Sequence, residues 1–157
     1  MTLRTLFTER RAPGFSATEL MVVVAIFGIL AAMSTPFFLR YYQSAALKAA
    51  TEEVAVYVNQ ARQLAIKENQ SVCVQRTTSS LRFRVNGCSG TTWVGPGTDA
   101  SGNLNLPTGF TVTSSADPVF SYLGAASPAA TFTVTNTGDG RTLRVAVSAS
   151  GRVTVGP

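Results

Sequence analysis

An uncharged run of membrane length near the start of the chain limits most strongly what this sequence can fold into. From Leu20 to Leu39 the only polar side chains are Ser34 and Thr35, and a helix needs roughly 20 apolar residues to cross a hydrocarbon core. One carboxylate, Glu19, directly precedes the run. A charge there costs on the order of a few kcal/mol at the bilayer centre and less toward the edge. We therefore expect a membrane-spanning helix whose leading carboxylate needs a partner from outside the run.

The residues that lead into the run resemble the class III signal of type IV prepilins and pseudopilins: Gly14-Phe15-Ser16-Ala17-Thr18-Glu19. In that family a prepilin peptidase cuts after the glycine, and the new N-terminal residue is N-methylated. The resemblance implies cleavage between Gly14 and Phe15, methylation of Phe15, and Glu19 as an assembly contact with the α-amino group of a neighbouring subunit. The alternative is an ordinary signal anchor of a domain unrelated to filaments, with a carboxylate in the first turn where the helix dipole favours it.

The chain has 157 residues, which suits one soluble domain beyond the membrane segment. We expect a leader peptide at 1–14, which is excluded from fold reasoning, and the transmembrane half of an N-terminal helix at 15–39. The amphipathic half of this helix is expected at 40–70 and a β-rich globular domain at 71–157. The predicted class is α+β, with one long helix packed on a small antiparallel β domain.

The helix prediction depends on two patterns. Pro36 predicts a kink within one long helix, because proline removes a hydrogen bond and bends the axis; it could also mark the end of the membrane span. Beyond it, apolar residues recur at spacings of three and four, which is typical of an amphipathic helix: Leu47, Ala50, Val54, Tyr57, Ala61 and Leu64. We expect this stripe to pack on a sheet, with a coiled coil as the alternative, and the helix to end at 69–71.

Alternation of apolar and polar residues predicts strands in the rest of the chain. Strands are expected at 71–76, 81–85, 110–112 and 119–123, and irregular loops at 89–105 and 124–130. The segments 131–135, 142–148 and 152–155, separated by glycine-containing turns, predict a three-stranded antiparallel meander.

Charge and cysteine content bear on location. Arg10 and Arg11 in the leader favour a cytoplasmic N-terminus, which puts the anchor in the inner membrane and the domain in the periplasm. Cys73 and Cys88 can be oxidised there, and such a disulfide would stabilise the fold by about 3 kcal/mol in the chain-entropy model. The alternative is two free buried thiols. The sequence has no histidine, so we expect no metal site and no cofactor.

The second half of the chain narrows the resemblance. The segment 49–74, with its phrase Gln60–Val72, and the segment 131–155, with Gly140-Arg141 and Ser150-Gly151-Arg152-Val153, are similar to the GspH/FimT family. That family comprises minor pseudopilins of type II secretion systems and minor pilins of type IV pili. The resemblance implies a structural subunit whose partners are other pilins in a filament or tip complex, prepilin peptidase and the inner membrane. It does not separate secretion from pilus machinery, and residues 86–125 match no known pattern.

A DNA-binding minor pilin of a competence pilus is the alternative function. Some members of the family bind DNA through a Gly-Arg-x-Arg motif, which here is Gly151-Arg152-Val153-Thr154 and lacks the second arginine. Arg141, Arg144 and Arg152 could form a basic patch, because strand pairing brings distant residues together. The alternative, which we favour, is that these arginines are a solvated outer face, as we also expect of Arg82 and Arg84.

An enzyme is not expected. Without histidine the usual general base is absent, and each aspartate after Leu39 lies beside turn residues, where aspartate bonds to local backbone. No glycine-rich phosphate loop precedes a helix. From Arg40 onward ten Lys and Arg residues face six Asp and Glu residues, a mild excess that does not by itself imply nucleic acid.

Overall fold

The computed structural model of the chain describes residues 14–156, apart from the side chains of residues 35 and 36. The chain divides into two compact units, Met1–Tyr41 and Tyr42–Pro157, which we describe one at a time. The helix α1, Ala17–Glu68, contributes to both. Residues 1–13, most of the expected leader, lie outside the described residues.

The first unit contains the start of α1. The Ser16 hydroxyl accepts a hydrogen bond from the Glu19 backbone N–H at 3.2 Å, and the Ser16 carbonyl accepts one from the Leu20 N–H at 3.1 Å. Ser16 is therefore the N-cap of the helix. The helix is assigned through Pro36, and the kink at this residue stays a prediction.

In the second unit α1 presents the expected apolar stripe to the core. Alanine is frequent from Gln43 to Gln70 and neither glycine nor proline occurs there, so helix propensity is high. The stripe is buried except for Tyr57, which is half-buried. The helix ends where Asn69 adopts a φ of 51° and the Gln70 N–H bonds to the Ala65 carbonyl at 3.1 Å, an arrangement typical of helix C-termini.

The first sheet runs in the order β3-β2-β1-β6-β7, and β4 also pairs with β2. Its strands are β1 Val72–Arg76, β2 Ser80–Val85, β3 Thr91–Thr92, β4 Asn103–Asn105, β6 Val119–Phe120 and β7 Ala126–Ser127. Three predictions were wrong here. The segments 89–105 and 124–130 are not wholly irregular, because β3, β4 and β7 form in them, and β6 ends at Phe120 because a turn begins at 121.

The second sheet runs in the order β10-β9-β8-β5. Its strands are β5 Phe110–Ser114, β8 Ala130–Asn136, β9 Thr142–Val147 and β10 Val153–Gly156. All neighbours are antiparallel. The predicted three-stranded meander is confirmed as β8-β9-β10, and β5 joins it as a fourth strand along β8.

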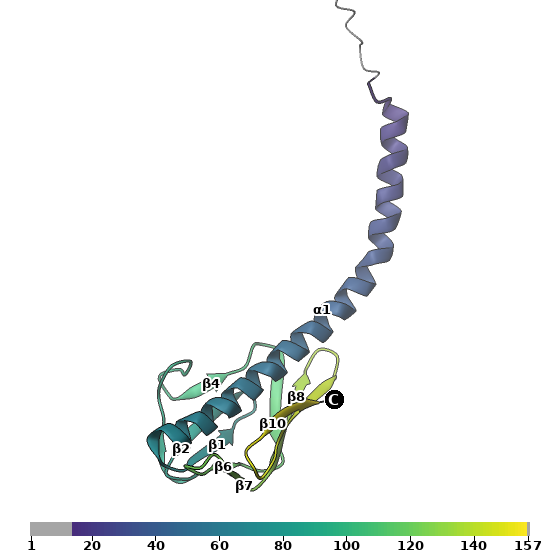
Figure 1. Cartoon of the computed structure of the whole chain (residues 1–157). Helices are drawn as coiled ribbons and strands as arrows, with labels where there is room; N and C mark the ends of the chain where they lie inside the picture. Colours follow the sequence, from purple (N-terminus) through teal and green to yellow (C-terminus); the bar gives the residue numbers. More distant parts are fainter. Residues whose placement is uncertain (1–13, 157) are drawn as a thin grey trace, which may run out of the picture. The chain divides into compact units, whose positions relative to one another are not determined.

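The core lies between α1 and the two sheets, and Figure 1 shows the second-unit part of α1 lying across the strands. Its largest fully buried side chains include Phe83, Phe120 and Phe132. Every member of the core cluster lies between Leu47 and Val147, within the second unit. The predicted α+β class, with a helix packed on a small antiparallel domain, is confirmed.

Candidate functional site

The first candidate site is the start of α1. Gly14 and Phe15 precede the helix and are exposed, and Glu19 lies exposed in its first turn. Ser16 followed three residues later by Glu19 is also the sequence signal of an N-terminal capping box. This signal could have predicted the start of the helix from the sequence. Ser16 satisfies the Glu19 N–H, so this turn of helix forms with the carboxylate turned to the surface.

The helix surface after Glu19 is apolar and uncovered. All described side chains from Leu20 to Leu39 are exposed, and by length and composition α1 can cross a membrane. The Ser34 hydroxyl donates to the Leu30 carbonyl at 2.8 Å, so this polar group needs no outside partner. An apolar surface of this extent is stable only when lipid or other helices cover it.

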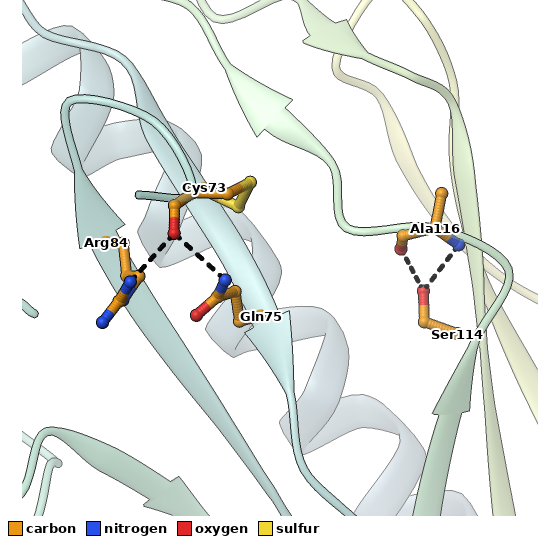
Figure 2. The surroundings of a disulfide bond; sticks show 6 residues. Cys73, Gln75, Arg84, Ser114 and Ala116 are labelled. Atoms are coloured by element: carbon orange, nitrogen blue, oxygen red, sulfur yellow. Dashed lines mark hydrogen bonds between the residues drawn. A yellow bond between two sulfur atoms is a disulfide. The ribbon is translucent and has the colours of Figure 1, made fainter. Parts of the chain in front are cut away.

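The two cysteines form a disulfide, as predicted (Figure 2). Cys73 lies on β1 and Cys88 follows β2, with 5.0 Å between their Cα atoms. The Cys88 carbonyl accepts hydrogen bonds from Gln75 Nε2 at 3.1 Å and Arg84 Nη1 at 3.0 Å. The disulfide therefore fixes the turn after β2 to the middle of the first sheet.

The arginines of β2 are not the solvated face that we predicted. Arg82 donates through Nε and Nη2 to Asn103 Oδ1 at 3.0 and 2.7 Å, and Arg84 donates to Cys88. Both side chains are half-buried, and their hydrogen-bond partners lie on β4 and in the turn after β2.

Asn103 connects Arg82 to a structured loop. Asp99 accepts hydrogen bonds from the backbone N–H groups of Ser101 and Asn103, both at 2.8 Å, and from Asn103 Nδ2 at 3.0 Å. The Asn105 amide adds a fourth at 3.2 Å. These bonds, led by the one from the Asn103 backbone, lower the pKa of Asp99 to about 2.

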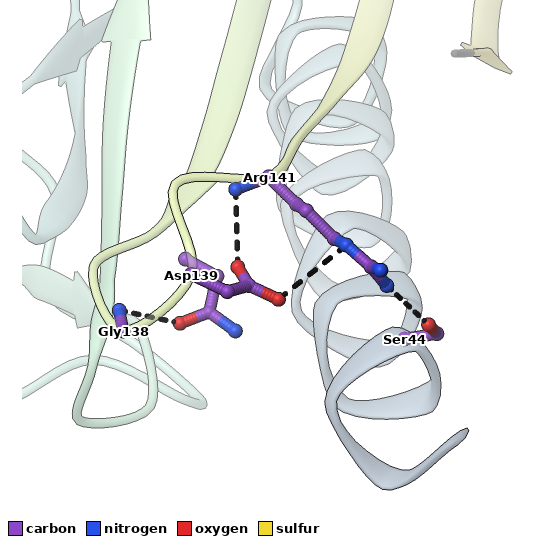
Figure 3. A network of polar contacts seen from close by, with 5 residues as sticks. Ser44, Gly138, Asp139 and Arg141 are labelled. Atoms are coloured by element: carbon purple, nitrogen blue, oxygen red, sulfur yellow. Dashed lines mark hydrogen bonds and ion pairs between the residues drawn. The ribbon is translucent and has the colours of Figure 1, made fainter. Parts of the chain in front are cut away.

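Arg141 is tied into the fold rather than presented to a ligand (Figure 3). Its Nη1 donates to Ser44 Oγ on α1 at 2.9 Å, and its Nε lies 3.7 Å from Asp139 Oδ2. Asp139 Oδ1 also accepts the Arg141 backbone N–H at 3.0 Å. Arg141 thus connects the β8–β9 turn to α1, and the Asp139 carboxylate lies close enough to balance its charge.

Arg144 and Arg152, by contrast, lie on one surface. Arg144 on β9 is opposite Thr133 and Gly156, and Arg152 precedes β10, where its carbonyl accepts the Ser148 N–H at 3.0 Å. The register places the two about four residues apart along the sheet, roughly 13 Å. The structure therefore brings two of the three predicted arginines to one face and directs the third elsewhere.

Among residues 14–156, the outer face of the second sheet carries no carboxylate side chain. Apart from the two arginines, Ala146 and Gly156, its side chains are hydroxyls on alternate positions of the strands: Thr111, Thr113, Thr131, Thr133, Thr135, Thr142, Ser148 and Thr154. A shallow depression of about 460 Å³ opens beside Arg152, lined also by Ser115 and Ala129. Hydroxyls and guanidinium groups are donors suited to anions.

Gly151, the glycine of the predicted Gly-Arg phrase, has a packing role. Its φ is +77°, and a Cβ there would lie 1.8 Å from the Gly124 carbonyl oxygen and 3.2 Å from Arg62 Nε. The β9–β10 turn, the β6–β7 turn and α1 meet at this point. Position 151 therefore requires glycine because its backbone lies close to Gly124, and this requirement is independent of the function of Arg152.

Among residues 14–156, no group of three or more His, Cys, Asp or Glu side chains could hold a metal ion. The remaining perturbed group is Tyr57, whose hydroxyl bonds to Glu53 Oε1 at 2.5 Å. Burial, then the hydrogen bond to Glu53 and its charge, raise the pKa of Tyr57 to about 12. Tyr57 belongs to the apolar stripe of α1, and Glu53 lies one helical turn before it and is half-buried.

Comparison with protein families matches residues 50–151 to the family described as type II transport protein GspH. No curated protein matches the chain significantly.

Three solved structures share the fold. The type IV minor pilin FimU of Pseudomonas aeruginosa is 17% identical, with a TM-score of 0.53 over 74% of this chain and 92% of that one. The minor pseudopilin EpsH from the type 2 secretion system of Vibrio cholerae is 15% identical, with a TM-score of 0.55 over 69% and 94%. Escherichia coli GspH, known from its solution structure, is 17% identical, with a TM-score of 0.55 over 71% of this chain and 87% of that one. At these identities the likeness shows the fold.

Proposed function

We propose, from the premise that this chain belongs to the GspH family of type II transport proteins, that it is a structural minor subunit assembled through its N-terminal helix. The assembly is a type II secretion pseudopilus or a type IV pilus. The observation that carries the proposal is the uncovered apolar surface of α1, headed by Glu19 and by the Gly14-Phe15 junction. No catalytic role is part of it.

The proposed sequence of events starts at the junction. Prepilin peptidase removes the leader after Gly14, Phe15 is methylated, and the helix stays in the inner membrane with the domain in the periplasm. The arginines of the leader support that orientation, and the Cys73–Cys88 disulfide supports an oxidising compartment for the domain.

Extraction into the filament transfers the apolar surface from lipid to neighbouring helices. Glu19 then pairs with the α-amino group of Phe15 on a neighbouring subunit. Two opposite charges stabilise each other more strongly in a low-dielectric bundle than in water, provided that neither is left unpaired. The N-cap supports this role, because Ser16 bonds to the Glu19 N–H and so holds the first turn, which carries the exposed Glu19 side chain.

The test compares Glu19→Gln and Glu19→Ala with the wild type in cells that assemble the filament. We expect normal processing, shown by mature chains that start at Phe15, and at least a tenfold loss from the sheared filament fraction, equivalent to about 1.4 kcal/mol. Thr18→Val, in the same turn, is the matched control. Normal incorporation of Glu19→Gln would refute the pairing, and a mature N-terminus other than Phe15 would support an unrelated membrane anchor instead.

A second candidate function is DNA binding by the outer face of the second sheet. The observation that favours it is a face that carries Arg144, Arg152 and a row of hydroxyls, and no carboxylate side chain among the residues that the structure describes. The engagement of Arg141 with Asp139 counts against it, because affinity for DNA grows with the number of phosphates neutralised.

Fluorescence anisotropy of the domain 42–157 with duplex DNA, across a salt series, tests this candidate. Two phosphate contacts predict a slope of log K against log salt near −2, which Arg144→Ala and Arg152→Ala should each reduce by about one. Arg76→Ala, exposed at the end of β1, is the control. Absence of binding at low salt would remove the candidate.

A further inference from the structure

The turn that follows β2 exposes an asparagine whose next residue is glycine. Asn86 is the one asparagine of the chain that a glycine follows, and its side chain is exposed. Among residues 14–156 its amide makes no hydrogen bond, whereas the side-chain amides of Asn103 and Asn136 are engaged in hydrogen bonds. The Asn86 side chain can therefore turn toward its own backbone.

The backbone nitrogen of Gly87, next along the chain, is weakly held. Asn86 and Gly87 both donate to the Ser71 carbonyl, at 2.8 Å from the Asn86 nitrogen and 3.4 Å from the Gly87 nitrogen. Their φ values are 68° and 83°, both positive as in a type I′ turn. A flip of the peptide plane between them gives the type II′ arrangement, in which only the first φ is positive, and it carries the Gly87 nitrogen to the side of Asn86 that bears Cβ. Gly87 permits this flip because glycine adopts either sign of φ, and a Cβ there would meet nothing within 4 Å.

We propose that Asn86 is a site of spontaneous covalent modification, in which the Gly87 nitrogen attacks the Asn86 side chain and the amide is lost. The Gly87 nitrogen gives up its proton and forms a bond to Asn86 Cγ, and the side-chain nitrogen leaves with one added proton as ammonia. Water then opens the resulting cyclic imide at one of its two carbonyls, which yields aspartate or isoaspartate. Because the attack is intramolecular, water is the only other reactant. The inference goes beyond the proposed function and does not depend on it.

Either product alters a segment that the fold fixes at both ends. Val85 pairs with Val72 across the first sheet, and Cys88 is bonded to Cys73. Both products replace a neutral amide by a carboxylate, and isoaspartate also adds one carbon atom to the backbone path between these two fixed points. An aged chain therefore differs from a new one in the charge of this turn and, where isoaspartate forms, in its backbone.

A matched control can be made in the same chain, because Asp139→Asn places a second asparagine directly before a glycine in a turn. Gly140 has a φ of 71°, similar to that of Gly87, but its N–H bonds to the Asn136 carbonyl at 2.9 Å. The side chain at 139 is held as well, since Asp139 Oδ1 accepts the Arg141 N–H at 3.0 Å and an asparagine oxygen can accept the same bond. The two pairs thus share their residue types and differ in how firmly the fold holds them.

The experiment incubates the purified full-length Asp139→Asn chain in detergent micelles at mildly alkaline pH and follows both positions by mass spectrometry of proteolytic peptides. In the folded chain we expect position 86 to react roughly fivefold faster or more than position 139, because each reaction waits for its turn to open locally. In urea with the disulfide reduced, where neither turn persists, the two rates should agree within about twofold. The wild type under the same conditions should yield aspartate and isoaspartate at position 86, at a rate that rises with pH because the attacking nitrogen must lose its proton.

Two results would overturn the inference. One is a folded wild-type chain that keeps Asn86 intact while the chain in urea reacts, because the fold would then protect the site. The other is equal rates at positions 86 and 139 in the folded variant, because the weak bond of the Gly87 N–H would then have no effect. The wild-type measurement stands by itself if Asp139→Asn disturbs the fold, which its urea midpoint reveals. Filament incorporation enters none of these outcomes, so the proposed function is tested separately.

Discussion

Replacing Gly151 by alanine should weaken the domain far more than the same change at a glycine with similar backbone angles. Gly151 and Gly140 have φ values of +77° and +71°, but a Cβ on Gly151 would lie 1.8 Å from the Gly124 carbonyl oxygen, while one on Gly140 would meet nothing within 4 Å. Both substitutions incur the left-handed penalty of about 1–2 kcal/mol. Only Gly151→Ala also forces backbone apart, which adds roughly 1–3 kcal/mol.

We therefore expect a loss of about 2–5 kcal/mol for Gly151→Ala and about 1–2 kcal/mol for Gly140→Ala. The assay is equilibrium unfolding of residues 42–157 in urea, followed by the fluorescence of Trp93, the one tryptophan of the chain. That segment contains the whole core cluster. The related solved chains align over 87–94% of their own length with 69–74% of this chain. We therefore expect the isolated segment to fold.

With an m value of about 2 kcal/mol/M, the middle of the usual range, a loss of this size moves the urea midpoint by roughly 1–2.5 M for Gly151→Ala. Equal midpoints for the two variants would refute the account, because the φ penalty would then be the whole effect and the contact with Gly124 would carry none. A changed m value would point instead to an altered unfolded state or to a third populated species.

Three further predictions concern stability. Replacing Cys73 and Cys88 together by serine should cost about 3 kcal/mol in the same urea assay, from the loop of 15 residues that the disulfide closes; the reduced wild type should match the variant. The pKa of Asp99 in the folded state is lowered to about 2, so the Asp99 carboxylate stabilises the fold above about pH 4 and this stabilisation is lost as the pH falls toward 2. The urea midpoint of Asp99→Asn should therefore decline less over that range than the midpoint of the wild type. Because the pKa of Tyr57 is raised to about 12, the stability it confers is complete below about pH 10 and is lost as the pH rises through 12; Tyr57→Phe should flatten this alkaline decline.

The regular elements could be predicted because local pattern and packing agree in them. Leu47, Val54 and Leu64 recur with helical spacing and are all buried. Phe132 and Val134 on β8, and Val145 and Val147 on β9, alternate with polar residues and are buried as expected. The antiparallel meander follows, since short glycine-containing turns allow only neighbouring strands to pair.

The short strands could not be predicted, because their pairing depends on contacts distant in sequence. Thr91 and Thr92 form β3 only through pairing with Val85 and Arg84, and two residues carry no periodic signal. Arg84, opposite Thr92 in this pairing, is half-buried and bonds to the Cys88 carbonyl. The alternation of Arg82 and Arg84 along the strand predicted a solvated face, because the segments that supply their hydrogen-bond partners carry no periodic signal in the sequence.

At the candidate site, the sequence predicted the residues but not their surroundings. Arg141, Arg144 and Arg152 look equivalent along the chain, and only the position of α1 reveals that Arg141 bonds to Ser44. Arg62 lies outside the predicted apolar stripe of the helix. Its contact with Gly124 and Gly151 depends on two turns that lie 62 and 89 residues away in the printed sequence.

Assembly through Glu19 should be separable from folding by mutation, because Glu19 and the core lie in different units of the chain. Glu19 lies in the first unit, and no core residue precedes Leu47, so a substitution at Glu19 removes nothing that the domain needs to fold. A Glu19 variant should then keep a folded domain on a chain that stays in the membrane. If a Glu19 variant instead lost the folded domain, helix and domain would not be independent, and assembly and folding would have to be one process.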